Sequence, residues 1–243
     1  MKKLISALVA GIVGISSVQA VAEDVEFGID TLVGFQSAYV YRGTNLYDGV
    51  SIQPQITGSA DFGDSGTFIA DVWDHSSASN SDNSKRFNEV DYTLGYSVPV
   101  DIVTLGAGYK WYRYQNNNID FPASQEFYVS AALDTVANPT LVYYRDVDAY
   151  EMNYYELTFS EEFDEACGMG DGFNVEPYVT FGFVSDADGI YERGGLVQTT
   201  VGVSSTLALG DISVVPSLNY SFESDAVTDN QFWAGFVLGY SWL

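Results

Sequence analysis

The last stretch of the chain, residues 230–243, restricts the possible fold more than any other. Read in steps of two, it places Phe232, Ala234, Phe236, Leu238, Tyr240 and Trp242 on one face and Trp233, Gly235, Val237, Gly239 and Ser241 on the other. A period of two is typical of a β-strand, because successive side chains point to opposite sides of the pleat. An apolar strand at the edge of a sheet invites aggregation unless it is paired. Pairing with the first strand of the chain solves this problem, so the pattern predicts a closed barrel.

The same alternation recurs along the chain in strand-length segments. We predict strands at 25–42, 50–62, 67–73, 87–98, 102–114, 125–134, 140–145, 152–163, 173–184, 196–207, 212–222 and 230–243. In the first of these segments, Glu26, Asp30 and Arg42 share one face, as the strand of a barrel bathed in lipid requires. The prediction is an all-β, transmembrane, antiparallel up-and-down barrel of about twelve strands. Counts of ten or fourteen stay open, because 67–73 and 140–145 are weak segments.

The connections form two populations. Short turns are expected at 63–66, around Pro99, at 135–139 and at 210–211, and longer polar loops at 43–49, 74–86, 115–124, 146–151, 185–195 and 223–230. The exception is 161–172, a long acidic and glycine-rich connection on the short-turn side. Short periplasmic turns and long outer loops are typical of outer-membrane barrels, so both termini are expected in the periplasm. The alternative, a secreted β-sandwich with a tyrosine-rich core, does not need such long alternation.

Aromatic residues gather near the strand ends, which predicts two girdles at the membrane interfaces. The outer girdle is expected to contain Tyr39, Tyr41, Trp73, Trp111 and Tyr143, and the inner one Phe27, Tyr96, Phe159, Tyr240 and Trp242.

The N-terminus predicts export. Met1-Lys2-Lys3 is a basic segment, an apolar run follows, and Ala20-Val21-Ala22 is typical of a cleavage site. We therefore expect a cleaved signal peptide at 1–22, a single barrel domain at 23–243, and a location in the outer membrane of a Gram-negative bacterium. Cys167 is the only cysteine, so no internal disulfide is possible.

A short motif at the outer end of the first segment points to a family. Ser37-Ala38-Tyr39-Val40-Tyr41-Arg42-Gly43 resembles the S-x-Y-x-(aromatic)-R-G signature of the TorF family of porin-like outer-membrane proteins. The motif residues are Ser37, Tyr39, Tyr41, Arg42 and Gly43; family members often carry Asp where this chain has Ala38. The resemblance implies a channel and supplies no catalytic residues. The end of the chain is similar to the terminal signal read by barrel-assembly machinery, with Gly235, Leu238, Tyr240 and Trp242 at suitable spacing.

The face of the strands that should line the lumen is acidic. The candidates are Glu26, Asp30, Arg42, Glu89, Asp91, Lys110, Glu126, Glu156 and Glu176. Rings of carboxylates favour cations in pores, although inward polar groups can also simply fill a narrow barrel. Arg42 is expected to pair with acidic wall residues, either as part of a solute site or as charge balance.

No catalytic, metal or cofactor site is predicted. His75 stands beside Asp74 and Ser76, but neighbours on an extended chain point to opposite faces, so the group cannot assemble a triad by itself. We expect His75 to lie in a solvated loop. We expect the acidic loops, including Asp186 and Asp188, to be solvated loops without a bound metal ion. The chain has 33 acidic and 9 basic residues, which excludes nucleic acid as a partner. The expected partners are outer-membrane lipid and the assembly machinery.

The functional expectation is a small diffusion channel that prefers cations or neutral solutes. The alternative is a non-conducting structural or interaction barrel whose acidic loops bind a partner. An outer-membrane hydrolase using His75 is a more distant third, so the chain is not expected to be an enzyme.

Overall fold

The computed structural model describes residues 25–78, 87–115, 121–164, 174–185, 191, 193–224, 226–227 and 229–242. The expected signal peptide, Cys167, Asp186 and Asp188 lie outside these residues. Within them the chain is almost entirely β-structure, and its only helical turn is a 3₁₀ turn, Gly63–Ser65. No helix in the described segments is long and apolar enough to cross a membrane.

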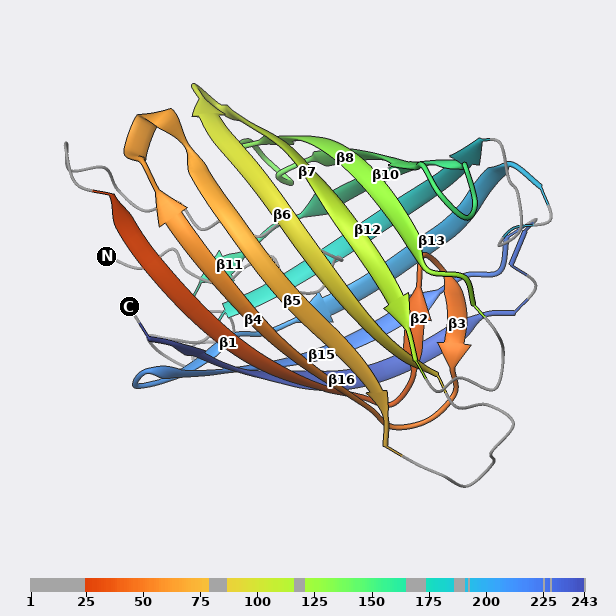
Figure 1. Cartoon of the computed structure of the whole chain (residues 1–243). Helices are drawn as coiled ribbons and strands as arrows, with labels where there is room; N and C mark the ends of the chain where they lie inside the picture. Colours follow the sequence, from red (N-terminus) through yellow and green to blue (C-terminus); the bar gives the residue numbers. More distant parts are fainter. Residues whose placement is uncertain are drawn as a thin grey trace.

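The strands form a closed antiparallel barrel (Figure 1). In chain order the wall consists of β1 (Glu26–Gln36), β4 (Ser51–Asp61), β5 (Thr67–Ser77), β6 (Asn88–Val100), β7 (Val103–Tyr114), β8 (Ser124–Leu133), β9 (Thr140–Asp146), β10 (Asn153–Ser160), β12 (Asn174–Ser185), β13 (Gly195–Ser204), β15 (Ile212–Ser221) and β16 (Gln231–Ser241). Each strand pairs with the next, and β16 returns to β1. The predicted barrel of 12 strands is confirmed.

The seam between β1 and β16 removes the open edge. Phe35 lies opposite Phe236, and their rings stack with centroids 5.0 Å apart. The indole nitrogen of Trp242 donates to Thr31 Oγ1 at 3.0 Å, and Ser241 Oγ donates to Asp30 Oδ1 at 2.5 Å. The closing strand is therefore held by side chains as well as by its ladder.

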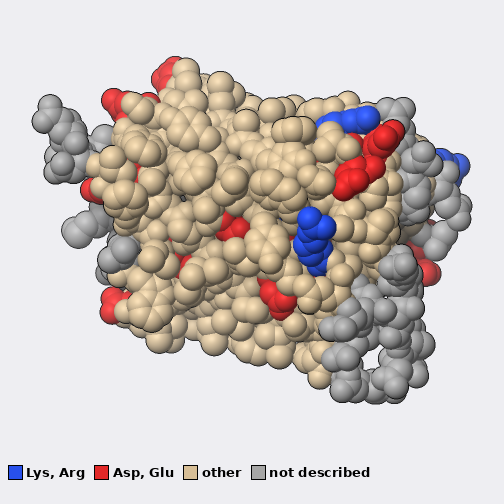
Figure 2. Space-filling model, in the orientation of Figure 1, with Lys and Arg blue, Asp and Glu red and all other residues tan. Residues whose placement is uncertain are grey.

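The outer face of the barrel is apolar. Phe232, Phe236, Leu238 and Tyr240 on β16, and Trp242 directly after it, are all exposed. Charged side chains are few along the middle of the barrel in Figure 2. Such a continuous apolar surface is far larger than soluble proteins present, and it suits a hydrocarbon environment.

The two ends of the barrel differ. The N- and C-terminal ends of the described chain lie at one end, together with the 3₁₀ turn Gly63–Ser65 (Figure 1). We call it the turn end. The opposite end, where β1 passes into the segment that leads to β4, is the loop end. Some short elements are not among the twelve wall strands: β11 (Phe163–Asp164) pairs with the start of β12, β14 (Leu207–Leu209) pairs with β15, and a hairpin stands at the loop end.

That hairpin corrects the prediction for the first strand. The wall strand β1 ends at Gln36, not at Arg42, and the chain bends at Ser37 and Ala38. It then forms β2 (Tyr39–Tyr41) and β3 (Thr44–Tyr47), a sheet of their own that is not paired with the wall. The prediction was wrong because Tyr39-Val40-Tyr41 continues the alternation of β1, so its local pattern is that of a longer strand.

Candidate functional site

The β2–β3 hairpin lies inside the mouth of the barrel at the loop end (Figure 1). Ala38, Tyr39, Arg42 and Tyr47 are all buried. On one side, the Tyr39 hydroxyl donates to Glu89 on β6 at 2.9 Å. Elsewhere, Asn45 Nδ2 donates to Gln231 on β16 at 2.9 Å, so the hairpin contacts widely separated parts of the wall.

The tip of the hairpin is a two-residue turn of Arg42 and Gly43. Both residues have positive φ, 48° and 80°, as type I′ turns require. A Cβ at Gly43 would stand only 2.9 Å from the carbonyl oxygen of Val197, so glycine is needed for space as well as for φ. The signal that could have revealed the hairpin was this X-Gly pair between two short alternating stretches, residues 39–41 and 44–47.

Arg42 makes a two-pronged ion pair with Glu126 on β8. Its Nη1 is 2.7 Å from Oε1 and its Nη2 is 2.9 Å from Oε2. The side chain of Arg42 is 5% exposed and that of Glu126 is 2% exposed. Burial lowers the pKa of Arg42, but the Glu126 carboxylate raises it further, so the net shift is upward and the guanidinium stays charged. The predicted pairing of Arg42 with an acidic wall residue is thus what the structure has.

Tyrosines surround this ion pair. The Arg42 guanidinium carbon lies 4.8 Å from the ring centre of Tyr41, 4.5 Å from that of Tyr144 and 4.2 Å from that of Tyr154. The Tyr112 hydroxyl donates to Glu126 Oε2 at 2.5 Å, and Tyr191 donates to the carbonyl oxygen of Arg42 at 3.0 Å. All the ring contacts fall within the roughly 6 Å range of cation–π attraction.

A second cluster fills the space beside the hairpin. The Tyr39 ring stacks on His75 with centroids 4.4 Å apart and also packs against Trp73 and Phe87. Burial and the nearby Glu89 carboxylate raise the pKa of the Tyr39 phenol, so it remains a hydrogen-bond donor. The prediction that Tyr39, Tyr41 and Trp73 belong to the outer girdle was wrong, because all three side chains pack inside the mouth.

His75 also differs from its prediction. It lies in β5, not in a solvated loop, and its side chain is completely buried among aromatic rings. Glu89 is its register partner on β6. The extended backbone keeps Asp74 and Ser76 on the other face of the strand, so the structure assembles no triad there.

A row of polar side chains crosses the inner wall of the barrel from β5 to β8. Asp71, Thr93, Lys110 and Glu126 are successive register partners on β5, β6, β7 and β8. Lys110 Nζ is 2.9 Å from Asp91 Oδ2. Asp71 Oδ1 accepts hydrogen bonds from Gln55 and Thr57, whereas its Oδ2 and the Thr93 hydroxyl have no hydrogen-bond partner among the described residues.

The inner wall has more carboxylates than cations. Its buried acidic side chains include Asp71, Glu89, Asp91, Glu126 and Asp146, and Glu156 and Glu176 are half-buried, against Arg42 and Lys110. The Tyr154 hydroxyl donates to Gln198 Oε1 at 2.5 Å and lies 3.4 Å from Oε2 of Glu156. Two further candidates lie near the ends of the wall: Glu26 is exposed at the rim, and Asp30 contacts Ser241 in the seam.

The residues of the expected assembly signal lie on both sides of β16. Leu238, Tyr240 and Trp242 face outward, whereas Gly235 faces its register partner Gln36 across the seam. A Cβ at Gly235 would stand 2.4 Å from the carbonyl oxygen of Phe35, closer than real Cβ atoms come. Glycine there is therefore a packing requirement of the closed barrel.

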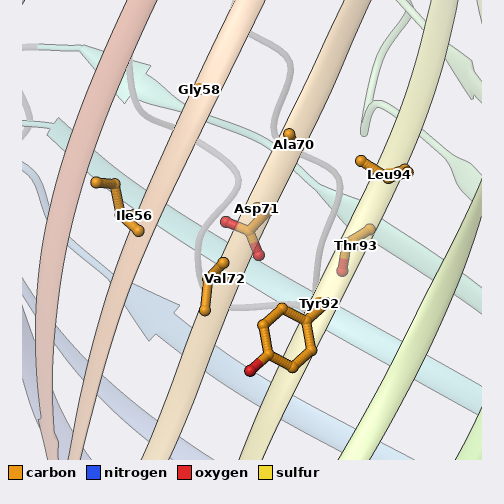
Figure 3. A pocket seen from close by; sticks show the side chains of 8 residues that line it. All are labelled: Ile56, Gly58, Ala70, Asp71, Val72, Tyr92, Thr93 and Leu94. Atoms are coloured by element: carbon orange, nitrogen blue, oxygen red, sulfur yellow. The ribbon is translucent and has the colours of Figure 1, made fainter.

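A shallow hollow of about 340 Å³ lies on the outer face of β4, β5 and β6 (Figure 3). Ile56, Val72, Tyr92 and Leu94 stand around it, and it is open where Gly58 and Ala70 carry little or no side chain. Asp71 and Thr93, which belong to the polar row of the inner wall, also line it. The other six lining residues face outward, so the hollow opens away from the hairpin site.

Compared by sequence, the chain matches no protein-family model and no curated protein. Its resemblance to the TorF family therefore remains a prediction. Among solved structures it is similar to LpxR from Salmonella typhimurium, with 8% identity and a TM-score of 0.58 over 88% of this chain and 99% of that one. It is also similar to the COG4313 outer membrane channel from Pseudomonas putida F1, with 8% identity and a TM-score of 0.54 over 95% and 100%. At this identity the likeness shows the fold, which is that of the outer-membrane barrels.

Proposed function

We propose that this chain is an outer-membrane channel for small cations and neutral solutes, closed at its mouth by its own hairpin. The observation that carries the proposal is that β2 and β3 form a separate sheet, held in the mouth by side-chain contacts to a charged inner wall. A plug that shares no ladder with the wall can leave it as a unit without breaking the barrel. The COG4313 neighbour is itself described as a channel, and that description supports the same class.

The preference for cations follows from the wall. Its carboxylates outnumber its cations, and Arg42, one of those cations, belongs to the hairpin. When the hairpin leaves, the wall becomes more acidic still. Confined carboxylates concentrate cations and exclude anions. We place the loop end outside the cell and both termini in the periplasm, because most connections at the turn end are short, the one between β10 and β12 being the exception.

The second candidate is a non-conducting structural barrel. The observation that favours it is the close packing around the hairpin, where Tyr39, Tyr47 and Phe87 form a buried aromatic cluster. A permanently packed mouth would pass no solute.

A shortened barrel separates the two candidates. Gln36 and Ser51 are register partners, so residues 38–49 can be replaced by Asn-Gly, a pair that favours tight hairpin turns. Ser37 is kept, because its backbone N–H and its Oγ both bond to Ala234. We expect little current from the wild-type protein in a planar bilayer of potassium chloride, and steady cation-selective current from the shortened barrel.

The matched control is the shortened barrel with Glu126→Gln, which removes the carboxylate left without Arg42. It should insert and conduct as well, with weaker selectivity. Folded, heat-modifiable shortened barrels of both kinds that carry no current would overturn the channel and leave the structural barrel.

A further inference from the structure

The Arg42 guanidinium occupies a site that the barrel wall builds almost alone. Glu126 is on β8, Tyr112 on β7, Tyr144 on β9 and Tyr154 on β10, whereas Tyr41 alone comes from the hairpin. We call Glu126, Tyr112, Tyr144 and Tyr154 the guanidinium cage. If the hairpin moves, these four groups stay in place, because they belong to paired strands of the wall.

Loss of Arg42 changes the balance of the cage. With the hairpin in place, Glu126 has 2% side-chain exposure and accepts hydrogen bonds from Arg42 and Tyr112. Removing Arg42 alone leaves a buried carboxylate without this partner, which is destabilising. Withdrawal of the whole hairpin breaks the same ion pair, and another cation that takes the place of Arg42 in the cage offsets that loss.

The geometry selects the kind of cation. Both Glu126 oxygens accept from the same planar group, at 2.7 and 2.9 Å, and two wall tyrosines lie 4.5 and 4.2 Å from its centre. A guanidinium group meets both requirements, because it is planar, has a fork of N–H donors and stacks on rings. An ammonium group lacks the fork, and a quaternary ammonium can lie against the rings but donates nothing to Glu126.

We infer that the cage is a binding site for small solutes that carry a guanidinium group, and that Arg42 is the internal occupant with which they compete. Binding of such a solute and release of the hairpin are then the same event. This names a solute class for the proposed channel and rests on it for its physiological meaning, but the binding itself can be tested without any current.

The test uses the purified Arg42→Ala barrel, whose cage is vacant, and N-methylguanidinium at millimolar concentration. A ligand that binds the folded state raises its thermal unfolding temperature. We expect N-methylguanidinium to raise the Tm of Arg42→Ala and to bind about tenfold more tightly than methylammonium, the ratio expected for the loss of one hydrogen bond to a charged group. Tetramethylammonium should have the weakest effect. In the wild-type protein Arg42 competes for the cage, so the rise in Tm at the same concentration should be much smaller.

Two further variants complete the test. Arg42→Ala with Glu126→Gln should lose the rise, because the carboxylate is gone. The shortened barrel lacking residues 38–49 has the same vacant cage. If Arg42→Ala does not fold, the same Tm measurement is made on the shortened barrel. Equal responses to the three cations, or a response that survives Glu126→Gln, would overturn the inference. If N-methylguanidinium binds but the shortened barrel carries no potassium current, the cage is a binding site and the channel proposal is wrong.

Discussion

Arg42 and Glu126 stand 84 positions apart in the sequence and meet in a two-pronged ion pair inside the barrel, at 2.7 and 2.9 Å. The arginine belongs to a hairpin tip and the glutamate to the wall. This pair is the main ionic link between the plug and the barrel, so its removal should affect both stability and gating.

Removing one partner of the pair should cost more than removing both. We expect Arg42→Ala to lower the free energy of unfolding, measured with urea in detergent, by about 3–5 kcal/mol, because it leaves Glu126 buried and unpaired. Adding Glu126→Gln should restore part of that loss, since no buried charge then lacks a partner. The control is Arg113→Ala, an exposed arginine on the outer face of β7, for which a small change is expected. A double variant as unstable as the sum of the two single variants would show that the pair is not coupled.

Selectivity should depend on the carboxylates that have no cation beside them. Asp91 is balanced by Lys110, whereas Asp71 and Glu89 have no ion pair among the described contacts. In the shortened barrel, we expect Asp71→Asn with Glu89→Gln to move the cation-selective reversal potential towards zero, most clearly at low salt, where screening is weaker.

The control for selectivity is Glu26→Gln, because Glu26 is exposed at the rim. It should leave the reversal potential nearly unchanged. An anion-selective shortened barrel would contradict the role given to the acidic wall. Unchanged selectivity after Asp71→Asn and Glu89→Gln would show that solutes follow another path.

Closure of the barrel should be sensitive to Gly235. A side chain there collides with the carbonyl of Phe35, so Gly235→Val is expected to reduce the heat-modifiable, folded fraction on electrophoresis. The matched control is Gly58→Ala, since a Cβ at Gly58 has only an ordinary contact at 3.9 Å. Normal assembly of Gly235→Val would mean that the seam opens more easily than its register indicates.

The orientation in the membrane can be tested with epitope tags. A tag inserted between Gln115 and Ser124, at the loop end, should be labelled on intact cells. A tag in the turn Gly63–Ser65 should be labelled only after the outer membrane is permeabilised. The reverse result would place the hairpin on the periplasmic side and require a different route of access to the cage.

The wall of the barrel could be predicted from the alternation of residues along the chain. All twelve predicted segments correspond to wall strands, and the face of Phe232, Phe236 and Leu238 is the outer one. These predictions succeeded because alternate side chains of each wall strand face the lipid and the interior, so the local sequence shows a period of two. The inward direction of Glu89, Lys110 and Glu126 followed from the same period.

The contacts of the interior side chains depend on the closed barrel and could not be predicted from the local pattern. Tyr39-Val40-Tyr41 alternates like a strand whether it continues the wall or turns into the mouth. The residues around His75 fit the end of a strand as well as the start of a loop. What distinguishes the outcomes is the set of partners that the far strands supply: Glu89 for Tyr39, Glu126 for Arg42, and the rings of Tyr39 and Phe87 for His75. Those partners become neighbours only when the ring of strands closes. The local alternation of residues does not indicate which side chains will face one another across the barrel.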